Sequence, residues 1–325
     1  MLRQFHIDGD QDSEFTIGYS SLKEIGLKSV VSPKVSTYLG PVFYLQYACN
    51  KAGSVRLSEY MKIVRYHVDL RRRFGELSNF DRSSGKLVLS ETDLDEYVST
   101  FGIPLELSPE LRGFYVQSVA RRIMFLFDHR RSGKVSIKRL LLENVTLSTE
   151  AFMKLYTLYL DMDIDGNGLL SKSELARYPG GLLSVHAIDR IYETFQTYEA
   201  DMDFKGYLDL MYVLEHPSHP SSIRYVWKLL DVNSAGRIGE KEFLPFHTAI
   251  LKPFPAAPYK PVHLFHETMD ILNITSCTHV TLSQLLSADS KSATSVMNML
   301  IDTHAFYLYD NREALLLTAM QKQSA

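Results

Sequence analysis

One twelve-residue segment of this chain has the residue types and the spacing of a calcium-binding loop. Residues 163–174 read Asp-Ile-Asp-Gly-Asn-Gly-Leu-Leu-Ser-Lys-Ser-Glu and match the pattern D-x-[DN]-x-[DN]-G-x₅-E at every specified position. A hard divalent cation needs several oxygen ligands at short range, which this spacing supplies. The sequence therefore predicts a Ca²⁺ site whose ligands are Asp163, Asp165, Asn167, Leu169 (through its carbonyl), Ser171 and Glu174.

The residues around these ligands also favour a helix-loop-helix unit. Gly168 stands where the backbone must bend sharply, a conformation that glycine adopts at little cost. Ser171 and Glu174 form an S-x-x-E capping box that predicts the start of the next helix. Apolar residues recur at helical spacing before the loop, at Phe152, Leu155, Tyr156 and Tyr159.

Composition limits the class of protein. The 325 residues are 45% hydrophobic and 22% charged, which is ordinary for a folded globular protein, and the net charge of −3 does not favour nucleic-acid binding. The two cysteines, Cys49 and Cys277, cannot form a disulfide framework and favour a reducing compartment. No secretory signal and no stretch of about 18 apolar residues is present. We expect a cytoplasmic protein without a membrane span.

Weaker copies of the same loop predict an array of related units. Five further segments combine a glycine with an aliphatic residue two positions later, and they begin at Ala48, Asp81, Asp128, Asp201 and Asp231. In paired units of this kind, neighbouring loops join through the aliphatic residue in a short two-stranded ribbon. The aliphatic positions are 55, 88 or 89, 135, 170, 208 and 238. We expect three pairs: 55 with 88 or 89, 135 with 170, and 208 with 238.

Two of these copies make different predictions about metal. The loop at Asp128 has Arg130 and Arg139 where carboxylates should stand, so we expect it to be free of metal because a cation would face like charge. The loop at Asp231 keeps Asn233 and Glu242 but has lost the oxygen ligand at its fifth position, and weak binding there is left open.

The fold class predicted from these patterns is mainly α, an array of paired EF-hand-like helix-loop-helix units with short two-stranded ribbons and a C-terminal helical segment. Four prolines in residues 252–261 predict an extended connector. The expected divisions are an N-terminal segment, three paired units, the connector and the helical segment, at residues 1–34, 35–110, 111–185, 186–251, 252–261 and 262–325.

Motifs of common enzyme classes are absent from the sequence. There is no nucleotide-binding loop, nucleophile elbow, kinase signature or zinc-protease motif, so we expect a non-catalytic protein. Basic clusters occur at 71–73, 121–122 and 130–131. They are interpreted as solvated faces, with a docking surface for an acidic partner as the alternative.

The order of several segments resembles the B'' (B-double-prime) regulatory subunits of protein phosphatase 2A. The resemblance covers roughly residues 35–316. It is carried by FYVQSVARRIMFLFD (114–128), YLDMDIDGNGLLSKSELARY (159–178), DMDFKGYLDLMYVLEH (201–216), YVWKLLDVNSAGRI (225–238) and MLIDTHAFYLYDNREAL (299–315). The last segment is most similar to the short branch of the family that is linked to centrosomes and to plant cortical microtubule arrays.

This resemblance implies a non-catalytic, calcium-binding subunit that joins a scaffold of HEAT repeats and a catalytic phosphatase subunit. Such a subunit directs the choice and location of phosphoprotein substrates, here at the centrosome or basal body, at microtubule arrays or in the nucleus. The calcium ligands implied by the family are the six residues of the 163–174 loop named above. The alternatives are a stand-alone EF-hand calcium sensor and a cytoskeletal adaptor.

Overall fold

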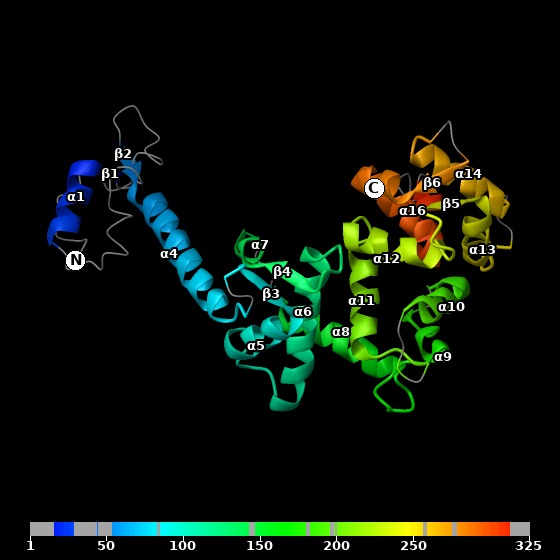
Figure 1. The fold of residues 1–325 in the computed structure, drawn as a ribbon, viewed down its shortest axis with the longest axis horizontal. Coiled ribbons are helices and arrows are strands. Elements are labelled where there is room, and N and C mark those ends of the chain that lie inside the picture. Colours follow the sequence, from blue (N-terminus) through cyan, green and yellow to red (C-terminus); the bar gives the residue numbers. More distant parts are fainter. Residues whose placement is uncertain are drawn as a thin grey trace, which may run out of the picture. The chain divides into compact units, whose positions relative to one another are not determined.

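The computed structural model describes residues 16–28, 44, 54–82, 85–142, 147–179, 183–195, 198, 200–255, 259–274 and 278–312. Contacts divide the chain into two compact units, residues 1–80 and 81–325 (Figure 1). Each unit is described by itself. Most of the predicted N-terminal segment lies outside the described residues.

The described residues of the first unit form two strand-helix pairs. Strand β1 (Thr16–Gly18) leads directly into α1 (Tyr19–Lys28), and β2 (Ser54–Arg56) leads into α4 (Leu57–Asn79). The strands pair antiparallel, with residue 17 opposite residue 55. Tyr44 and Tyr60 are buried with their ring centroids 5.8 Å apart, so aromatic packing holds these elements together.

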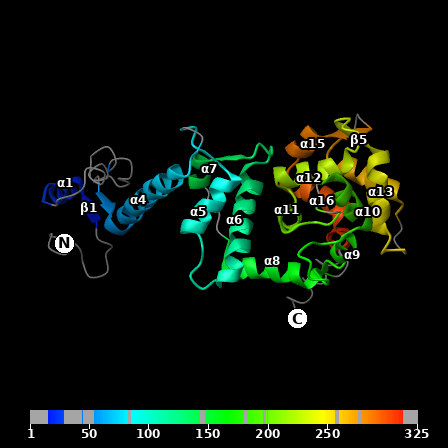
Figure 2. The same cartoon turned by 60° about the horizontal axis from the view of Figure 1, so that its bottom comes forward.

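The second unit repeats the same arrangement over a longer stretch (Figures 1 and 2). Its strands are β3 (Val88–Ser90), β4 (Lys134–Ser136), β5 (Arg237–Gly239) and β6 (His279–Thr281). Its helices are α5 (Glu91–Phe101), the 3₁₀ turn η3 (Pro109–Leu111), α6 (Arg112–Phe127), α7 (Ile137–Leu142), α8 (Thr149–Met162), α9 (Lys172–Leu175), α10 (Val185–Thr194), α11 (Phe204–Glu215), α12 (Pro220–Leu230), α13 (Glu240–Leu251), α14 (Pro261–Ile271), α15 (Leu282–Ser287), α16 (Ser290–Ile301) and α17 (Thr303–Asp310).

Strand β3 and the bridge residue Leu170 are each followed at once by a helix whose start is capped by local hydrogen bonds. Ser90 before α5 and Ser171 before α9 both accept from the backbone three residues on, and an acidic side chain there returns the bond. These capping boxes satisfy amide groups that a helix start leaves unpaired. The predicted fold class is confirmed: the described residues are mainly helical with short antiparallel ribbons.

The predicted pairing of the loops is wrong. Leu89 pairs with Val135, residues 170 and 202 form a bridge, and Ile238 pairs with Val280. The partner segments at 17 and 280 have Phe15 and Thr278 where the pattern requires a glycine, so the pattern does not detect them and the predicted pairs are shifted along the chain. The division into domains stays a prediction.

The weak loop copy at Asp201 is also wrong. Gly206 lies inside α11, and the side chain of Asp203 caps that helix by accepting from the amide of Gly206 at 2.8 Å. Leu208, the expected ribbon residue, is a fully buried residue of the same helix. The Asp-x-Asp-x-x-Gly pattern here is a helix cap, because aspartate favours N-cap positions as well as metal loops.

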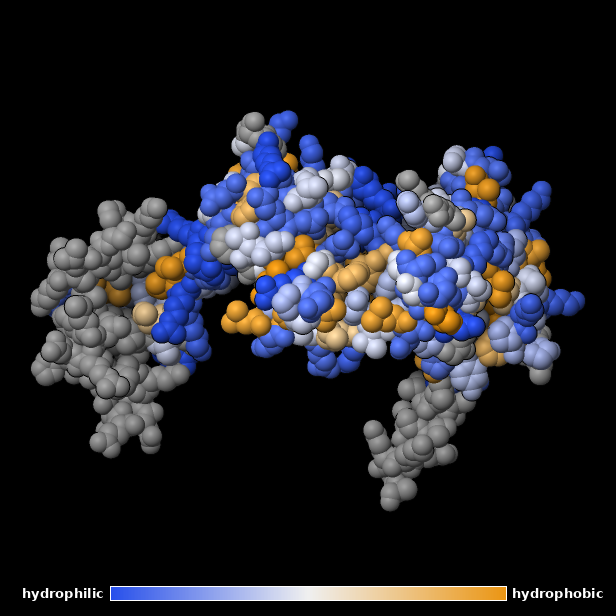
Figure 3. Space-filling model, turned by 90° about the horizontal axis from the view of Figure 1, so that it is seen from below, coloured by the Kyte–Doolittle hydropathy of each residue, from blue (hydrophilic) through white to orange (hydrophobic). Residues whose placement is uncertain are grey.

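Helix α6 packs against both α5 and α11. A continuous hydrophobic core extends from Phe125 on α6 to Phe306 on α17. On the face shown in Figure 3, polar side chains cover much of this unit and hydrophobic ones form separate groups among them. None of the described helices is both long and apolar enough to span a bilayer.

Candidate functional site

The predicted calcium loop lies between α8 and α9. Carboxylate oxygens of Asp163, Asp165 and Glu174 lie within 4.8 Å of one another, a grouping suited to a metal ion. Gly166 and Gly168 have φ angles of +68° and +77°, in the left-handed region that favours glycine. The two glycines let the chain fold back on itself, so that the ends of the loop meet.

Asp163 provides the test of whether the residues fit a cation. Its Oδ2 accepts from the amide of Gly168 at 3.0 Å, which closes the loop. Its Oδ1 is buried and has no hydrogen-bond partner among the described residues. A buried carboxylate oxygen without a donor is costly, and a divalent cation would satisfy it. The donor set is all oxygen, which suits calcium, and so the residues fit this metal.

Glu174 closes the loop from the other end. Its Oε1 accepts from the amide of Ile164 at 2.9 Å, and its Oε2 accepts from the amide and hydroxyl of Ser171 at 2.9 and 2.7 Å. Burial raises the pKa of Glu174, but these hydrogen bonds outweigh burial and hold the pKa below its usual value. The side chain is therefore a carboxylate at neutral pH and is already turned toward the first residues of the loop.

The remaining predicted ligands lie along the same turn and contact one another. Asn167 donates its side-chain amide to Asp165 Oδ2 at 3.0 Å, and its own Oδ1 accepts from the amide of Leu169 at 2.7 Å. Asp165 Oδ1 accepts from the backbone of Asn167 at 3.1 Å. These hydrogen bonds are exposed, and so the groups can give them up and bind an ion at little cost.

Backbone pairing supports the loop from its inner side. The amide and carbonyl of Leu170 exchange two hydrogen bonds of 2.8 Å with those of Met202. The hydroxyl of Tyr159 donates to the carbonyl of Gly168 at 2.6 Å, and that of Tyr192 donates to the carbonyl of Leu170. Two buried aromatic residues thus fix the strand portion of the loop, which positions its glycines and carboxylates.

The loop at Asp231 keeps the shape but uses its oxygens internally. Asp231 Oδ2 accepts from Gly236 at 3.0 Å, and its Oδ1 accepts from the amide of Ala235 at 2.7 Å. Glu242 accepts from the amide of Gly239 at 2.8 Å. Both oxygens of the first aspartate therefore already have donors, in contrast to the loop at Asp163.

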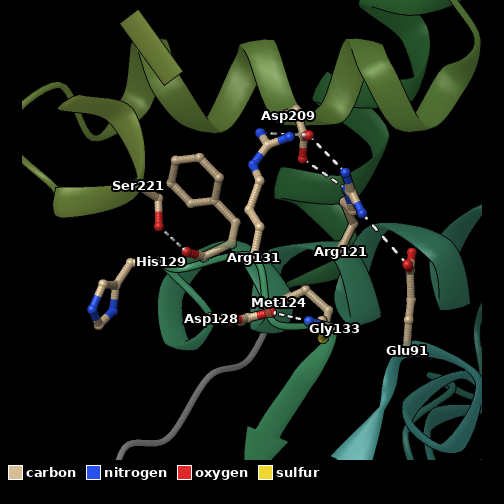
Figure 4. Close-up of a pocket in the computed structure, with 10 residues that line it drawn as sticks. Glu91, Arg121, Met124, Asp128, His129, Arg131, Gly133, Asp209 and Ser221 are labelled. Atoms are coloured by element: carbon tan, nitrogen blue, oxygen red, sulfur yellow. Dashed lines mark hydrogen bonds and ion pairs between the residues drawn. The ribbon is translucent and has the colours of Figure 1, made fainter. Parts of the chain in front are cut away.

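Sequence reasoning missed a charged cluster between α6 and α11 (Figure 4). Arg121 donates to both oxygens of Asp209 at 2.7 and 2.6 Å, and Arg131 reaches the same carboxylate at 3.2 Å. Glu91 lies 3.4 Å from Arg121 on the other side. Asp209 is buried, and its presence within the otherwise apolar stretch Leu208–Val213 is the signal that could have predicted a partner.

Two arginines that were interpreted as solvated surface therefore form internal ion pairs. Arg131 also lies over the rings of Phe195 and Tyr225, at 5.5 and 5.9 Å from their centroids. Nearby, Arg122 pairs with Glu215 at 3.0 Å. Arg121 and Arg131 hold α6, the loop that follows it and α11 together.

Comparison with known proteins finds relatives of one kind along most of the chain. No family model matches the sequence. The chain is 29% identical to the B'' subunit gamma of serine/threonine-protein phosphatase 2A from Xenopus tropicalis, over 93% of the chain and 72% of that protein. Against the Danio rerio subunit of the same name, it is 28% identical over 100% of the chain and 76% of that protein. This chain is a homologue of the B'' regulatory subunits of protein phosphatase 2A.

More distant homologues of the B'' type extend the match to plants. The probable B'' subunit TON2 of Arabidopsis thaliana is 24% identical over 88% of the chain and 67% of that protein. These relatives are named as regulatory subunits, which agrees with the expectation that the chain itself is not an enzyme. The family resemblance expected from the sequence is confirmed.

A solved structure has the same fold. A PP2A PR70 holoenzyme structure, described as diCa, contains a chain that superposes with a TM-score of 0.58 at 21% identity, covering 67% of this chain and 92% of that one. At this level of identity the likeness establishes the fold.

Proposed function

We propose that this chain is a calcium-binding regulatory subunit of the B'' type, which assembles with the scaffold and catalytic subunits of protein phosphatase 2A. The observation that carries the proposal is the match to B'' subunits along 93–100% of the chain. A helical array without catalytic motifs suits a protein that works through broad contact surfaces. Its role would be to direct the catalytic subunit to phosphoprotein substrates.

The proposed calcium site is the loop 163–174. Asp163, Asp165 and Glu174 supply the carboxylates, and the buried Asp163 Oδ1 is the atom that most needs the ion. The remaining ligands are Asn167, the carbonyl of Leu169 and Ser171. Three carboxylates exceed the charge of one divalent ion by one, which suits binding in the sensor range of about 10⁻⁷ to 10⁻⁵ M.

Calcium bound here would act on helix α11 through backbone hydrogen bonds. The Leu170–Met202 bridge joins the loop to the residue before Asp203, which caps α11. Helix α11 carries Asp209, the acceptor for Arg121 of α6 and for Arg131 of the loop after α6. Fixing the loop would therefore stiffen the start of α11, a change that amide hydrogen exchange at Met202 and α11 measures with and without calcium.

Affinity purification tests the assembly. The tagged full-length chain should recover the scaffold and catalytic subunits from its own cells, and Glu174→Gln separates assembly from calcium dependence. Recovery of neither subunit, in calcium or in chelator, would refute the proposal. Recovery of calcium-dependent partners without phosphatase would favour a stand-alone sensor, and co-sedimentation with microtubules alone would favour a cytoskeletal adaptor.

We further propose a cytoplasmic location with enrichment at the centrosome or basal body, or at microtubule arrays. The support is the resemblance of residues 299–315 to the short branch of the family. Imaging the tagged chain against a centrosomal marker tests this location. A purely nuclear signal would contradict it.

A further inference from the structure

Three arginines and a histidine form one basic surface at the C-terminal end of α6. His129 and Arg130 lie in the loop directly after α6, Arg139 is on α7, and Arg224 is on α12. We call these four residues the arginine face. Arg130 and Arg139 are exposed, while His129 and Arg224 are partly exposed.

The members of this face come together through contacts at the end of α6. Arg139 donates to the carbonyl of Phe127 at 3.2 Å, two residues before His129. Ser221, one helical turn before Arg224, donates its hydroxyl to the carbonyl of Phe125. Burial and the positive charges of the three arginines lower the pKa of His129, which agrees with their closeness.

No carboxylate neutralises this face among the residues that the structure describes. The nearest is Asp128, whose Oδ1 accepts from Ser132 at 2.8 Å and whose Oδ2 accepts from Gly133 at 2.6 Å. The Nε atom of Arg224 is buried and, within the described part of the chain, has no hydrogen-bond acceptor. Unlike Arg121, which has Asp209 and Glu91, the three arginines of the face form no ion pair with a carboxylate of the described residues.

The helix dipole of α6 accounts for only part of this charge. A helix C-terminus carries roughly half a negative charge and attracts a cation, which explains why Arg139 covers the carbonyl of Phe127. Within the described part of the chain, Arg130 and Arg224 form no hydrogen bond with this helix end. They add positive charge that neither the dipole nor an internal ion pair requires.

We propose that the arginine face is a docking surface for an acidic segment, rich in aspartate and glutamate, of a partner protein. Guanidinium groups pair with carboxylates through charge-assisted hydrogen bonds, and here they come from three separate elements. His129 lines the same pocket as Asp209 and Glu91, but those two carboxylates already pair with Arg121 and Arg131 (Figure 4). A membrane or nucleic-acid surface needs a wider field of positive charge, which the net charge of −3 also disfavours.

Fluorescence anisotropy of a labelled hexaglutamate peptide, titrated with the full-length chain, tests this docking surface. Hexaglutamine is the uncharged control peptide. We expect hexaglutamate to bind at low salt and to weaken steeply as salt rises, while hexaglutamine does not bind. The double substitution Arg130→Gln/Arg224→Gln should weaken binding at least about fivefold because it removes two charge-assisted contacts.

A matched variant separates a local surface from overall charge. Arg177→Gln/Arg237→Gln removes the same charge from exposed arginines outside the face and should leave hexaglutamate binding unchanged. Equal losses in the two variants, or no binding by the wild type, would overturn the proposal. The proposal would also be overturned if the Arg130→Gln/Arg224→Gln variant lost binding to oligouridylate or to phosphatidylserine vesicles while its binding to hexaglutamate was unaffected.

Two further measurements keep the result interpretable. Thermal unfolding shows whether the double variant folds, and Arg130→Gln alone, at an exposed position, provides a mild variant if it does not. This proposal does not rest on phosphatase assembly. Hexaglutamate binding can fail while scaffold and catalytic subunits are still recovered, and the reverse result is equally distinguishable.

Discussion

The loops 163–174 and 128–139 have the same backbone turn but differ in how its charges are balanced. In each, the first aspartate accepts through Oδ2 from the glycine five residues later, at 3.0 Å in the first loop and 2.6 Å in the second. Those two glycines, Gly168 and Gly133, have φ angles of +77° and +76°. The turn therefore depends on the aspartate-glycine pair and not on the other ligand positions.

The two loops differ in which oxygen atoms are free to bind a cation. Asp163 Oδ1 is buried and has no donor among the residues that the structure describes, and Glu174 stands at the last position. Asp128 Oδ1 accepts from Ser132, and the last position holds Arg139, which donates to a backbone carbonyl. Such a loop can keep its shape through its own donors, whereas the intact one leaves an oxygen that only an external cation satisfies.

The largest expected effect comes from removing the closing carboxylate of the intact loop. Glu174→Gln keeps one acceptor oxygen but removes the charge and the bidentate contact, so calcium should bind at least about a hundredfold more weakly. Isothermal titration calorimetry measures this loss. Glu242→Gln, at the same position of the 231 loop, should leave the strong site unchanged. If Glu174→Gln and the wild type bound calcium with equal affinity, the contrast drawn between the 163–174 and 128–139 loops would be contradicted.

A second prediction concerns the ion pairs that hold the neighbourhood of the 128–139 loop. Arg121→Met leaves Asp209 with its longest contact only, and loss of a largely buried partner costs about 3 kcal/mol of unfolding free energy. The adjacent control, Arg122→Met, removes a pair with the half-exposed Glu215 and should cost about 1 kcal/mol or less. Urea unfolding in chelator and in calcium measures both. If Arg121→Met lowered the unfolding free energy in chelator but not in calcium, the idea that the ion pair with Asp209 stabilises this region independently of calcium would be contradicted.

A gain-of-function variant sharpens the comparison. Arg130→Asp/Arg139→Glu gives the 128–139 loop carboxylates at its first, third and last positions. It should then bind a second calcium ion weakly, in the range of about 10⁻⁴ to 10⁻³ M, because Asp128 must exchange a bond from Ser132 for the ion. Calorimetry in the Glu174→Gln background isolates this second site. No binding at millimolar calcium would show that the difference lies in more than these two side chains.

The smallest expected effect is on pH dependence. The pKa of Glu174 lies below its usual value, so the carboxylate stays charged at and above its ordinary pKa, and its contribution is lost only as pH falls through the lowered pKa. Calcium affinity should therefore change by less than about twofold between pH 7.5 and 6. Calorimetry across this interval provides the measurement, and a steep loss near pH 6 would contradict the assignment.

The prediction of the intact loop depends only on local determinants. Twelve consecutive residues include the ligands, the glycine and the capping box, so no distant contact was needed to recognise them. The pairing of loops depends instead on three-residue ribbons such as His279–Thr281, which have no distinctive composition. The Asp-x-Asp pattern at 201 was ambiguous because one residue type serves both helix caps and metal ligands. The bond between Arg121 and Asp209 joins residues 88 positions apart, which no local pattern reveals.

Calorimetric titration of calcium into chelator-treated, full-length wild-type protein tests the central claim most directly. The account predicts one strong equivalent with a dissociation constant of about 10⁻⁷ to 10⁻⁵ M, bound by the loop whose first aspartate retains a buried oxygen without a donor. Absence of any strong equivalent, or two strong equivalents of similar affinity, would contradict it.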